Sequence, residues 1–217
     1  MTQTLELVLE ATGQTLIMVF FSMIFSLVLG FPIGVLLCVT RPDGLIPKRV
    51  LYNVISKIVN VLRAFPFIIL IIVLFPITRI IVGSAIGTAA TIVPLSIAAA
   101  PFVARIIETA LNEVSPDLIQ AAKAMGSTSM QIIIKVLIPE ALPALVDGIT
   151  LTIINLIGYS AMAGIVGGGG LGDLANRYGY QRFRTDILIA AVIVILIMVE
   201  LIQLAGTKIS SHLQRKR

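Results

Sequence analysis

The side chains that most often carry out chemistry in proteins are sparse in this chain of 217 residues. It has one cysteine, Cys38, inside an apolar run, and one histidine, His212, in a basic stretch. One thiol cannot form an internal disulfide, and neither residue has neighbours at metal-ligand or acid–base spacing. No G-x-x-x-x-G-K-[ST] phosphate-binding loop occurs. The sequence therefore predicts no catalytic site, no metal site, no cofactor and no nucleotide-binding loop in this chain.

Polar and soft side chains within apolar segments are the other residues that could act on a solute. Polar groups inside a membrane usually face protein or water, so these side chains are candidates for a translocation path. Hydrogen bonds between helices explain each of them equally well. Asp147 and Glu200 lie toward helix ends and are interpreted as structural groups, not as proton carriers. The candidate path residues are Ser96, Asn155, Tyr159, Ser160 and Met162.

The composition indicates the kind of element that holds these residues. Hydrophobic residues make up 58% of the chain and charged residues 12%, and the mean hydropathy is +1.05. Because soluble domains carry about 25% charged residues, this is the composition of an all-α integral membrane protein with one membrane domain. The net charge of +5 is explained by the rule that basic residues favour the cytoplasmic side, so nucleic acid is not an expected partner and the lipid bilayer is.

Five segments are apolar and long enough for transmembrane helices, within a membrane domain over residues 13–206. Pro66 is expected to kink the second span, which begins in a polar, interfacial stretch. A basic cytoplasmic tail, 207–217, is expected after the last span. The predicted spans are about 15–40, 60–78, 81–104, 144–166 and 187–206.

Basic residues predict the orientation of these spans. The amino terminus has no Lys or Arg before its first apolar run, so it is expected to be uncleaved and outside. The carboxyl terminus is then cytoplasmic, and so are most basic loops. Arg177, Arg182 and Arg184 are the exception, because they lie outside; they suit either an acidic docked protein or a solvated face.

The segment 115–139 interrupts the apolar pattern between the third and fourth predicted spans. Ser115 is a good N-cap, Pro116 suits the first helical position, and Asp117 complements the helix dipole. Gly126 is placed to end this short amphipathic helix. The segment is interpreted either as a helical loop on the membrane surface or as a helix that docks into a partner's cleft.

Small residues favour the docking interpretation, since Ala121, Ala122 and Gly126 allow close backbone approach. Residues 127–129 can cap a second helix, which Pro139 and Pro143 are expected to break.

The stretch "QAAKAMGSTSMQIIIKVLIP" resembles the cytoplasmic signature of the permease subunits of ABC importers. That signature is Glu-Ala-Ala, three residues, Gly, nine residues, then apolar, any residue, apolar and Pro. This chain departs from it at Gln120, where the family usually has Glu. The resemblance implies a coupling helix that docks onto a dimer of ATPase subunits, which bind ATP and Mg²⁺. The implied ATPase-coupling residues are Gln120, Ala121, Ala122, Gly126 and Pro139.

A second resemblance covers residues 15–206 through "RAFPFIILIIVLFPITRIIVG", "AAPFVARIIETAL" and "GYSAMAGIVGGGGLGDLANRYGYQRF". These stretches look like the methionine-uptake branch of the binding-protein-dependent importers. The resemblance implies a type I ABC importer permease fold with five transmembrane helices, in the bacterial inner membrane. It further implies a permease homodimer whose path lies on the two-fold axis and receives methionine from an extracytoplasmic binding (lipo)protein.

The glycine run "GIVGGGGLGD" is a poor helix former, because each glycine costs about 1 kcal/mol relative to alanine. Such backbone is tolerated near membrane depth where it packs in protein or lines a watery cavity. We expect Gly167, Gly168, Gly169 and Gly170 to form an external gate or a seat for the binding protein, with a flexible external turn as the alternative.

An ATP-independent secondary carrier or channel is the main alternative function. It would be favoured by an inverted repeat, a charged pair near the bilayer midplane or a selectivity-filter motif, and none is evident in the sequence.

Overall fold

The computed structural model describes residues 2–215, and this part of the chain consists of helices joined by turns and loops, without strands. Single helices α1, α4 and α9 are long and apolar enough to cross a membrane, and two bent pairs raise the possible number of spans to five. The elements are α1 (Thr2–Thr40), α2 (Arg49–Ala64), α3 (Phe67–Val82), α4 (Thr88–Asn112), α5 (Pro116–Ala124), α6 (Ser129–Ile132), α7 (Ile138–Ile165), α8 (Gly170–Leu174) and α9 (Thr185–Gln214), with π-helical turns η1 (Ile133–Leu137) and η2 (Ala175–Tyr180).

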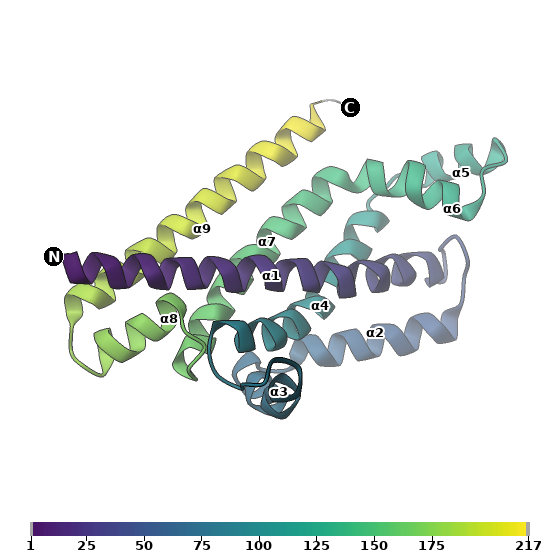
Figure 1. The fold of residues 1–217 in the computed structure, drawn as a ribbon. Helices are drawn as coiled ribbons and strands as arrows, with labels where there is room; N and C mark the ends of the chain where they lie inside the picture. The colour runs from purple at the N-terminus through teal and green to yellow at the C-terminus, as the bar shows by residue number, and fades with distance from the viewer. Residues whose placement is uncertain (1, 216–217) are drawn as a thin grey trace.

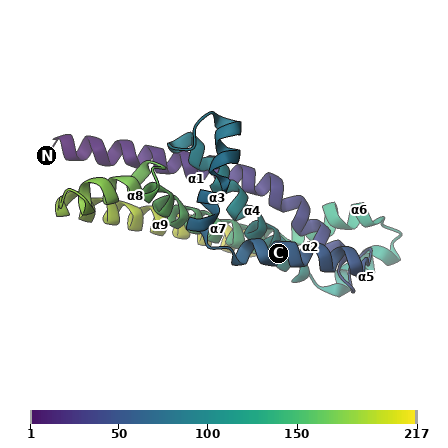
Figure 2. The same cartoon turned by 90° about the horizontal axis from the view of Figure 1, so that it is seen from below.

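The molecule is elongated, and its two ends carry different loops (Figure 1). Helices α5 and α6 lie at the end where α1 finishes, and α8 lies at the end where α1 begins. The view from below shows the same separation (Figure 2). We call these the coupling end and the glycine end.

Helices α1 and α4 form the closest-packed pair of the fold. A Cβ atom on Gly30 would lie 2.6 Å from the Ala100 carbonyl oxygen, and one on Gly34 would lie 2.6 Å from that of Ala104. Glycine four residues from glycine lets membrane helices approach closely, since it removes the side chains between them. Ser26 adds a hydrogen bond from its hydroxyl to the Ser96 carbonyl oxygen at 3.1 Å.

The second span is broken, not kinked as predicted. Helices α2 and α3 meet at 105°. Phe65 is extended, with φ −74° and ψ 127°, because a residue before proline disfavours the helical conformation. Pro66 then serves as the N-cap of α3. Figure 2 shows α3 running across the long axis of the molecule.

The helices that correspond to the third and fifth predicted spans are α4 and α9, and their bounds differ from those of the spans. Gly83 is left-handed at the end of α3, and α4 starts only at Thr88, so the predicted start of the third span at residue 81 is wrong; α4 continues to Asn112, past the predicted end. Helix α9 runs from Thr185 to Gln214. Residues 207–214 of the predicted basic tail are therefore helical and continue α9, and residues 216–217 lie outside the described part.

Pro139 and Pro143 do not break the chain, contrary to the prediction. Helix α6 passes through η1 directly into α7, which contains both prolines. Pro139 lies in the first turn of α7, and the π-helical turn before it shifts the hydrogen-bond register where proline has no N–H to donate. The coupling end is consequently joined to α7 by continuous helix.

Candidate functional site

Helix α5 begins and ends by the signals predicted from the sequence. The Ser115 hydroxyl accepts a hydrogen bond from the Asp117 N–H at 3.3 Å, with Pro116 in the first turn. Gly126 has φ +78°. Its N–H donates to the Lys123 carbonyl, and the Ser127 N–H donates to the Ala122 carbonyl. This pair of bonds is a Schellman motif, so the helix has a defined stop.

Helix α6 starts with a capping box. The Gln131 N–H donates to the Thr128 hydroxyl at 3.4 Å, and the Thr128 N–H donates to the Gln131 side-chain oxygen at 2.8 Å. This confirms the predicted cap within residues 127–129. Both ends of the turn between α5 and α6 are thereby fixed by hydrogen bonds.

The small residues of α5 do not share one open face. Ala122 is only 3% exposed and belongs to the core of its own chain, so it cannot form the surface offered to a partner. Ala121 and Gly126 are exposed. A Cβ on Gly126 would meet no atom of this chain within 4 Å, so within the chain the glycine is required for its left-handed backbone conformation and not for packing.

Large apolar side chains at the coupling end are exposed instead. Met125 is 79% exposed and Met130 is 63% exposed. We call this set the apolar tip; sequence reasoning did not single out its last two members, which lie about one helical turn apart across α6 and η1. Methionine is flexible and polarizable, which suits a docking surface. The apolar tip consists of Leu118, Met125, Met130 and Ile134.

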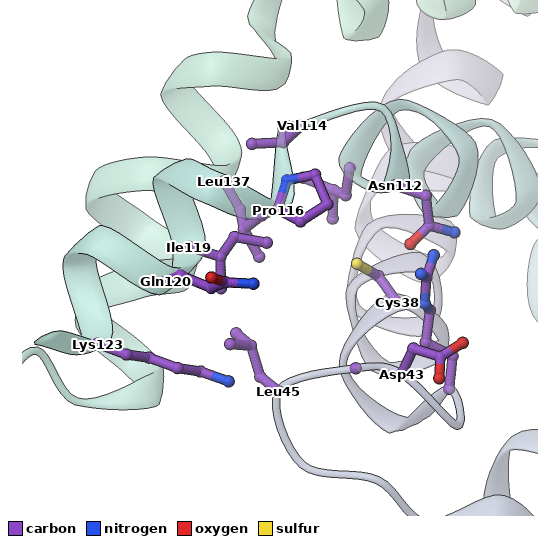
Figure 3. Close-up of a pocket in the computed structure, with 13 residues that line it drawn as sticks. Cys38, Asp43, Leu45, Asn112, Val114, Pro116, Ile119, Gln120, Lys123 and Leu137 are labelled. Atoms are coloured by element: carbon purple, nitrogen blue, oxygen red, sulfur yellow. The ribbon is translucent and has the colours of Figure 1, made fainter.

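A cavity of about 170 Å³ separates α5 from the connection between α1 and α2. Gln120 and Lys123 line it from α5, and Asp43 and Leu45 line it from the connection (Figure 3). Gln120 points into this cavity, toward its own chain. The departure from Glu at this position thus lies at a cavity between two segments of the same chain. Pro139 is exposed in α7, beyond the cavity.

The candidate path residues fall into two groups. Asn155 and Met162 are exposed on one face of α7, whereas Tyr159 is half-buried and stacks on Phe67 with ring centroids 4.7 Å apart. Ser160 is buried, and its hydroxyl donates to the Ile157 carbonyl at 2.7 Å.

Ser96 lies apart from the other path residues, between α1 and α4. It is 5% exposed, and its hydroxyl donates to the Ile92 carbonyl at 2.6 Å. The Ser96 hydroxyl therefore bonds within α4, and only the Ser96 carbonyl takes part in a hydrogen bond to α1.

The open face of α7 contains more residues than sequence reasoning singled out. Its exposed positions recur at helical spacing of three and four, so they lie in one row. We call this row the α7 face. It consists of Asp147, Leu151, Asn155, Gly158, Met162 and Ile165.

The glycine run forms a tight turn at the glycine end, and from Gly170 it returns to helix. Gly167, Gly169 and Gly170 have φ of 88°, 80° and 75°, a region that side chains disfavour. The Gly170 N–H donates to the Gln14 side-chain oxygen at 2.8 Å, and the Leu171 N–H donates to the Thr15 hydroxyl at 2.9 Å. The turn is therefore anchored to α1 and is not a free external loop.

The arginines beside this turn have partners within their own chain. Arg177 pairs with Asp173 at 2.5 Å, and the Arg182 guanidinium lies 4.6 Å from the centre of the Tyr178 ring. The hydrogen bond that Arg184 donates to Asp186, and then the charge of that carboxylate, raises the pKa of Arg184. These contacts orient the three side chains on the surface.

Membrane-length helices, with a capped hairpin that exposes apolar side chains at one end, define the class of the chain as an all-α integral membrane protein. Comparison with known proteins gives the class more closely. The chain belongs to the family of binding-protein-dependent transport system inner membrane components, whose pattern matches residues 30–216.

Individual relatives are similar over most of the chain. The probable D-methionine transport system permease protein MetI of Vibrio cholerae is 48% identical over 201 residues, which are 93% of this chain and 89% of the relative. The D-methionine permease MetI of Escherichia coli K12 is 53% identical over 158 residues, 73% of each chain. These relatives are transport permeases.

Two solved structures share the fold. A chain in the inward-facing crystal structure of the MetNI methionine ABC transporter superposes with a TM-score of 0.96 at 47% identity, covering 98% of this chain and 99% of that chain. A chain of an amino acid ABC transporter crystallised with histidines has a TM-score of 0.75 at 20% identity and covers 100% and 97%. The second comparison supports the fold alone.

Proposed function

We propose that this chain is the permease subunit of an ATP-driven importer that carries methionine across the bacterial inner membrane. The observation that carries the proposal is the match over 98% of the chain, at 47% identity, to a methionine ABC transporter. The curated relatives named for D-methionine transport support the same substrate.

The coupling end is the proposed contact with the ATPase subunits. A dimer of these partners binds and hydrolyses ATP with Mg²⁺, and the apolar tip packs into a groove on each subunit. The hydrogen-bonded caps at Ser115 and Thr128 make the hairpin rigid enough to transmit a push. Because α6 continues through η1 into α7, movement of the hairpin turns or tilts α7 directly.

The α7 face is the proposed wall of the translocation path. Its row contains Asp147 and Asn155 among apolar positions, and polar groups at membrane depth need water or protein. A second copy of the chain, related by a two-fold axis, would enclose a path between two such faces. Tyr159 and Ser160 support this wall from behind, and Ser96 is excluded from it by burial.

The glycine end is proposed to face the outside, with the amino terminus outside and the carboxyl terminus cytoplasmic, as the basic residues predict. A methionine-binding protein or lipoprotein then docks near the glycine turn. The turn at 167–170 closes the path on this side while Gln14 and Thr15 hold it.

Uptake by purified components tests the proposal. The permease, its ATPase and its binding protein are reconstituted in proteoliposomes with ATP inside, and labelled L- and D-methionine are measured separately. We expect uptake that needs both hydrolysable ATP and the binding protein. Uptake at the same rate with a non-hydrolysable ATP analogue would instead identify a secondary carrier or channel.

A further inference from the structure

A charged cavity opens between α2, α4 and α7 in the half of the molecule nearer the coupling end. Its volume is about 370 Å³, within the range of small-molecule sites. Arg63 and Arg105 line one part of it, and Glu113 and Asp147 line another. Charged groups on helices of a membrane protein are expensive unless they face protein, water or a ligand, so this cavity requires a functional explanation.

The two arginines are held differently. Arg105 donates to Glu108 at 2.5 Å, to Ser56 at 3.0 Å and to Asn60 at 2.8 Å, which fixes its guanidinium. Arg63 lies 5.7 Å from the centre of the Phe102 ring and has no ion pair among the described residues. The ring steadies the side chain by a cation–π contact while its donors stay available for an anion.

The carboxylates lie toward the coupling helix. A second cavity of about 410 Å³ shares Glu113 and Asp147 with the first and extends to Ser115 and Leu118 at α5. One Asp147 oxygen accepts a hydrogen bond from the Ser210 hydroxyl at 2.8 Å, which orients the carboxylate. The two carboxylates therefore lie on the side of the first cavity that continues toward α5, and neither arginine lines that continuation.

The walls between these charges are apolar. Ile106 and Leu151 line the first cavity. Gly148 lets α7 meet α4 at Ile106, since a Cβ there would overlap the Ile106 Cγ2. A ligand that suits this arrangement has a carboxylate, an ammonium group and an apolar side chain, each with a matching wall.

We propose that this cavity is a binding site for a zwitterionic α-amino acid on its way out of the translocation path. The substrate carboxylate binds Arg63 beside the fixed Arg105. The ammonium group faces Glu113 and Asp147, and the side chain lies along Ile106 and Leu151. The inference rests on the proposed function for the identity of that amino acid as methionine, and it adds a site inside the permease where the substrate is held by its charged ends.

Protection of an introduced thiol tests the site. In a Cys38→Ala background, Leu151→Cys places the only thiol of this chain at the cavity wall, where it is labelled with a maleimide in the purified permease–ATPase complex. We expect methionine to slow labelling. Methionine methyl ester, which lacks the carboxylate, and 4-(methylthio)butanoic acid, which lacks the ammonium group, should protect at least about 10-fold less well.

Matched variants separate the site from indirect effects. Arg63→Gln should raise the methionine concentration needed for half protection by about 10-fold to 100-fold, whereas Arg79→Gln, on an exposed residue of α3, should leave it unchanged. If Arg63→Gln does not fold, Glu113→Gln serves, with selective loss of the preference for the ammonium group. Leu196→Cys on the exposed surface of α9 should label at the same rate with or without methionine.

ATP-driven uptake in the same preparation distinguishes the two proposals. Active methionine uptake without any protection at Leu151→Cys overturns the site and leaves the proposed function standing. Protection by another zwitterionic amino acid, without methionine uptake, supports the site and overturns the proposed substrate. Equal protection by the ester and by methionine also overturns the site.

Discussion

At the scale of single residues, the glycine of the turn between α5 and α6 has a conformational role. Sequence reasoning assigned Gly126 both to the end of the helix and to close approach of a partner. The structure shows open space around its missing Cβ and a left-handed backbone with φ +78°. If only the backbone conformation matters at position 126, asparagine can replace the glycine, because it adopts the left-handed conformation. β-Branched residues cannot, because they do not adopt it.

The first prediction compares two substitutions at this glycine. Gly126→Asn should keep association with the ATPase and uptake close to the original level. Gly126→Val should strain the turn by about 1–2 kcal/mol and lower both, because the apolar tip is then presented at the wrong angle. Co-purification with the ATPase and initial uptake rates measure the difference; equal loss in both variants would show that the surface itself, and not the backbone angle, is what the partner needs.

At the scale of elements, the helix caps and stops set by neighbouring residues were predicted correctly, whereas the features set by packing between distant segments were not. The caps at Ser115 and Thr128 and the stop at Gly126 depend on neighbours within a few residues, so the sequence contains all their determinants. Pro66 marks the position of the bend locally, but the bend angle of 105° depends on how α2 and α3 pack. The helix that continues through Pro139 depends on a π-helical turn. Neither follows from the apolar pattern.

The candidate site shows the same division. The coupling segment was predictable because its motif is contiguous. The charged cavity was not, because Arg63, Glu113 and Asp147 lie on three separate helices. Ser96 and Asn155 look alike as polar residues in apolar runs, yet one is buried between helices and the other is exposed. Which face of a helix meets a neighbour decides their roles, and spacing alone did not reveal it.

The contact between α1 and α4 is long-range, yet a sequence motif that the sequence reasoning did not use indicates it. Gly30 and Gly34 are four residues apart in "LGFPIG", which is a small-residue motif for close helix packing. The structure places them against the Ala100 and Ala104 carbonyl oxygens.

A second prediction concerns the contact between α1 and α4. In Gly34→Ala the new Cβ would lie 2.6 Å from the Ala104 carbonyl oxygen and 2.7 Å from the Ile107 Cβ, and such overpacking costs about 1–3 kcal/mol. Thermal unfolding in detergent should therefore show a midpoint at least about 2 °C lower. Gly13→Ala is the matched control, because its Cβ meets nothing within 4 Å; it should not lower the midpoint, and equal shifts in both variants would contradict the packing argument.

At the scale of the whole molecule, a single chain leaves the α7 face, with its polar residues Asp147 and Asn155, uncovered. The α7 face and the charged cavity share Asp147 and Leu151, so the proposed path and the proposed amino-acid site are continuous. The exposed surface of α9 is different, since it carries a row of large apolar side chains such as Ile193, Leu196 and Ile197. Apolar surface of this kind is suited to lipid, whereas the α7 face is suited to a second copy around a watery path.

The last prediction uses that contrast to locate the two-fold axis. With Cys38→Ala as background, Met162→Cys and Gly158→Cys each place a thiol on the α7 face, and Leu196→Cys places one on α9. Disulfides need Cα atoms about 4.4–6.8 Å apart, so an oxidant in native membranes should link copies at Gly158 or Met162 when α7 faces its symmetry mate across the closed path. The yield of the cross-link should be highest in the state in which the path is closed at these positions. Adding ATP and the binding protein should change that yield, because the hairpin of α5 and α6 then moves α7. Cross-linking at Leu196 that equals or exceeds both α7 positions, measured as covalent dimer on non-reducing gels, would place the interface on α9 and remove the α7 face from the path.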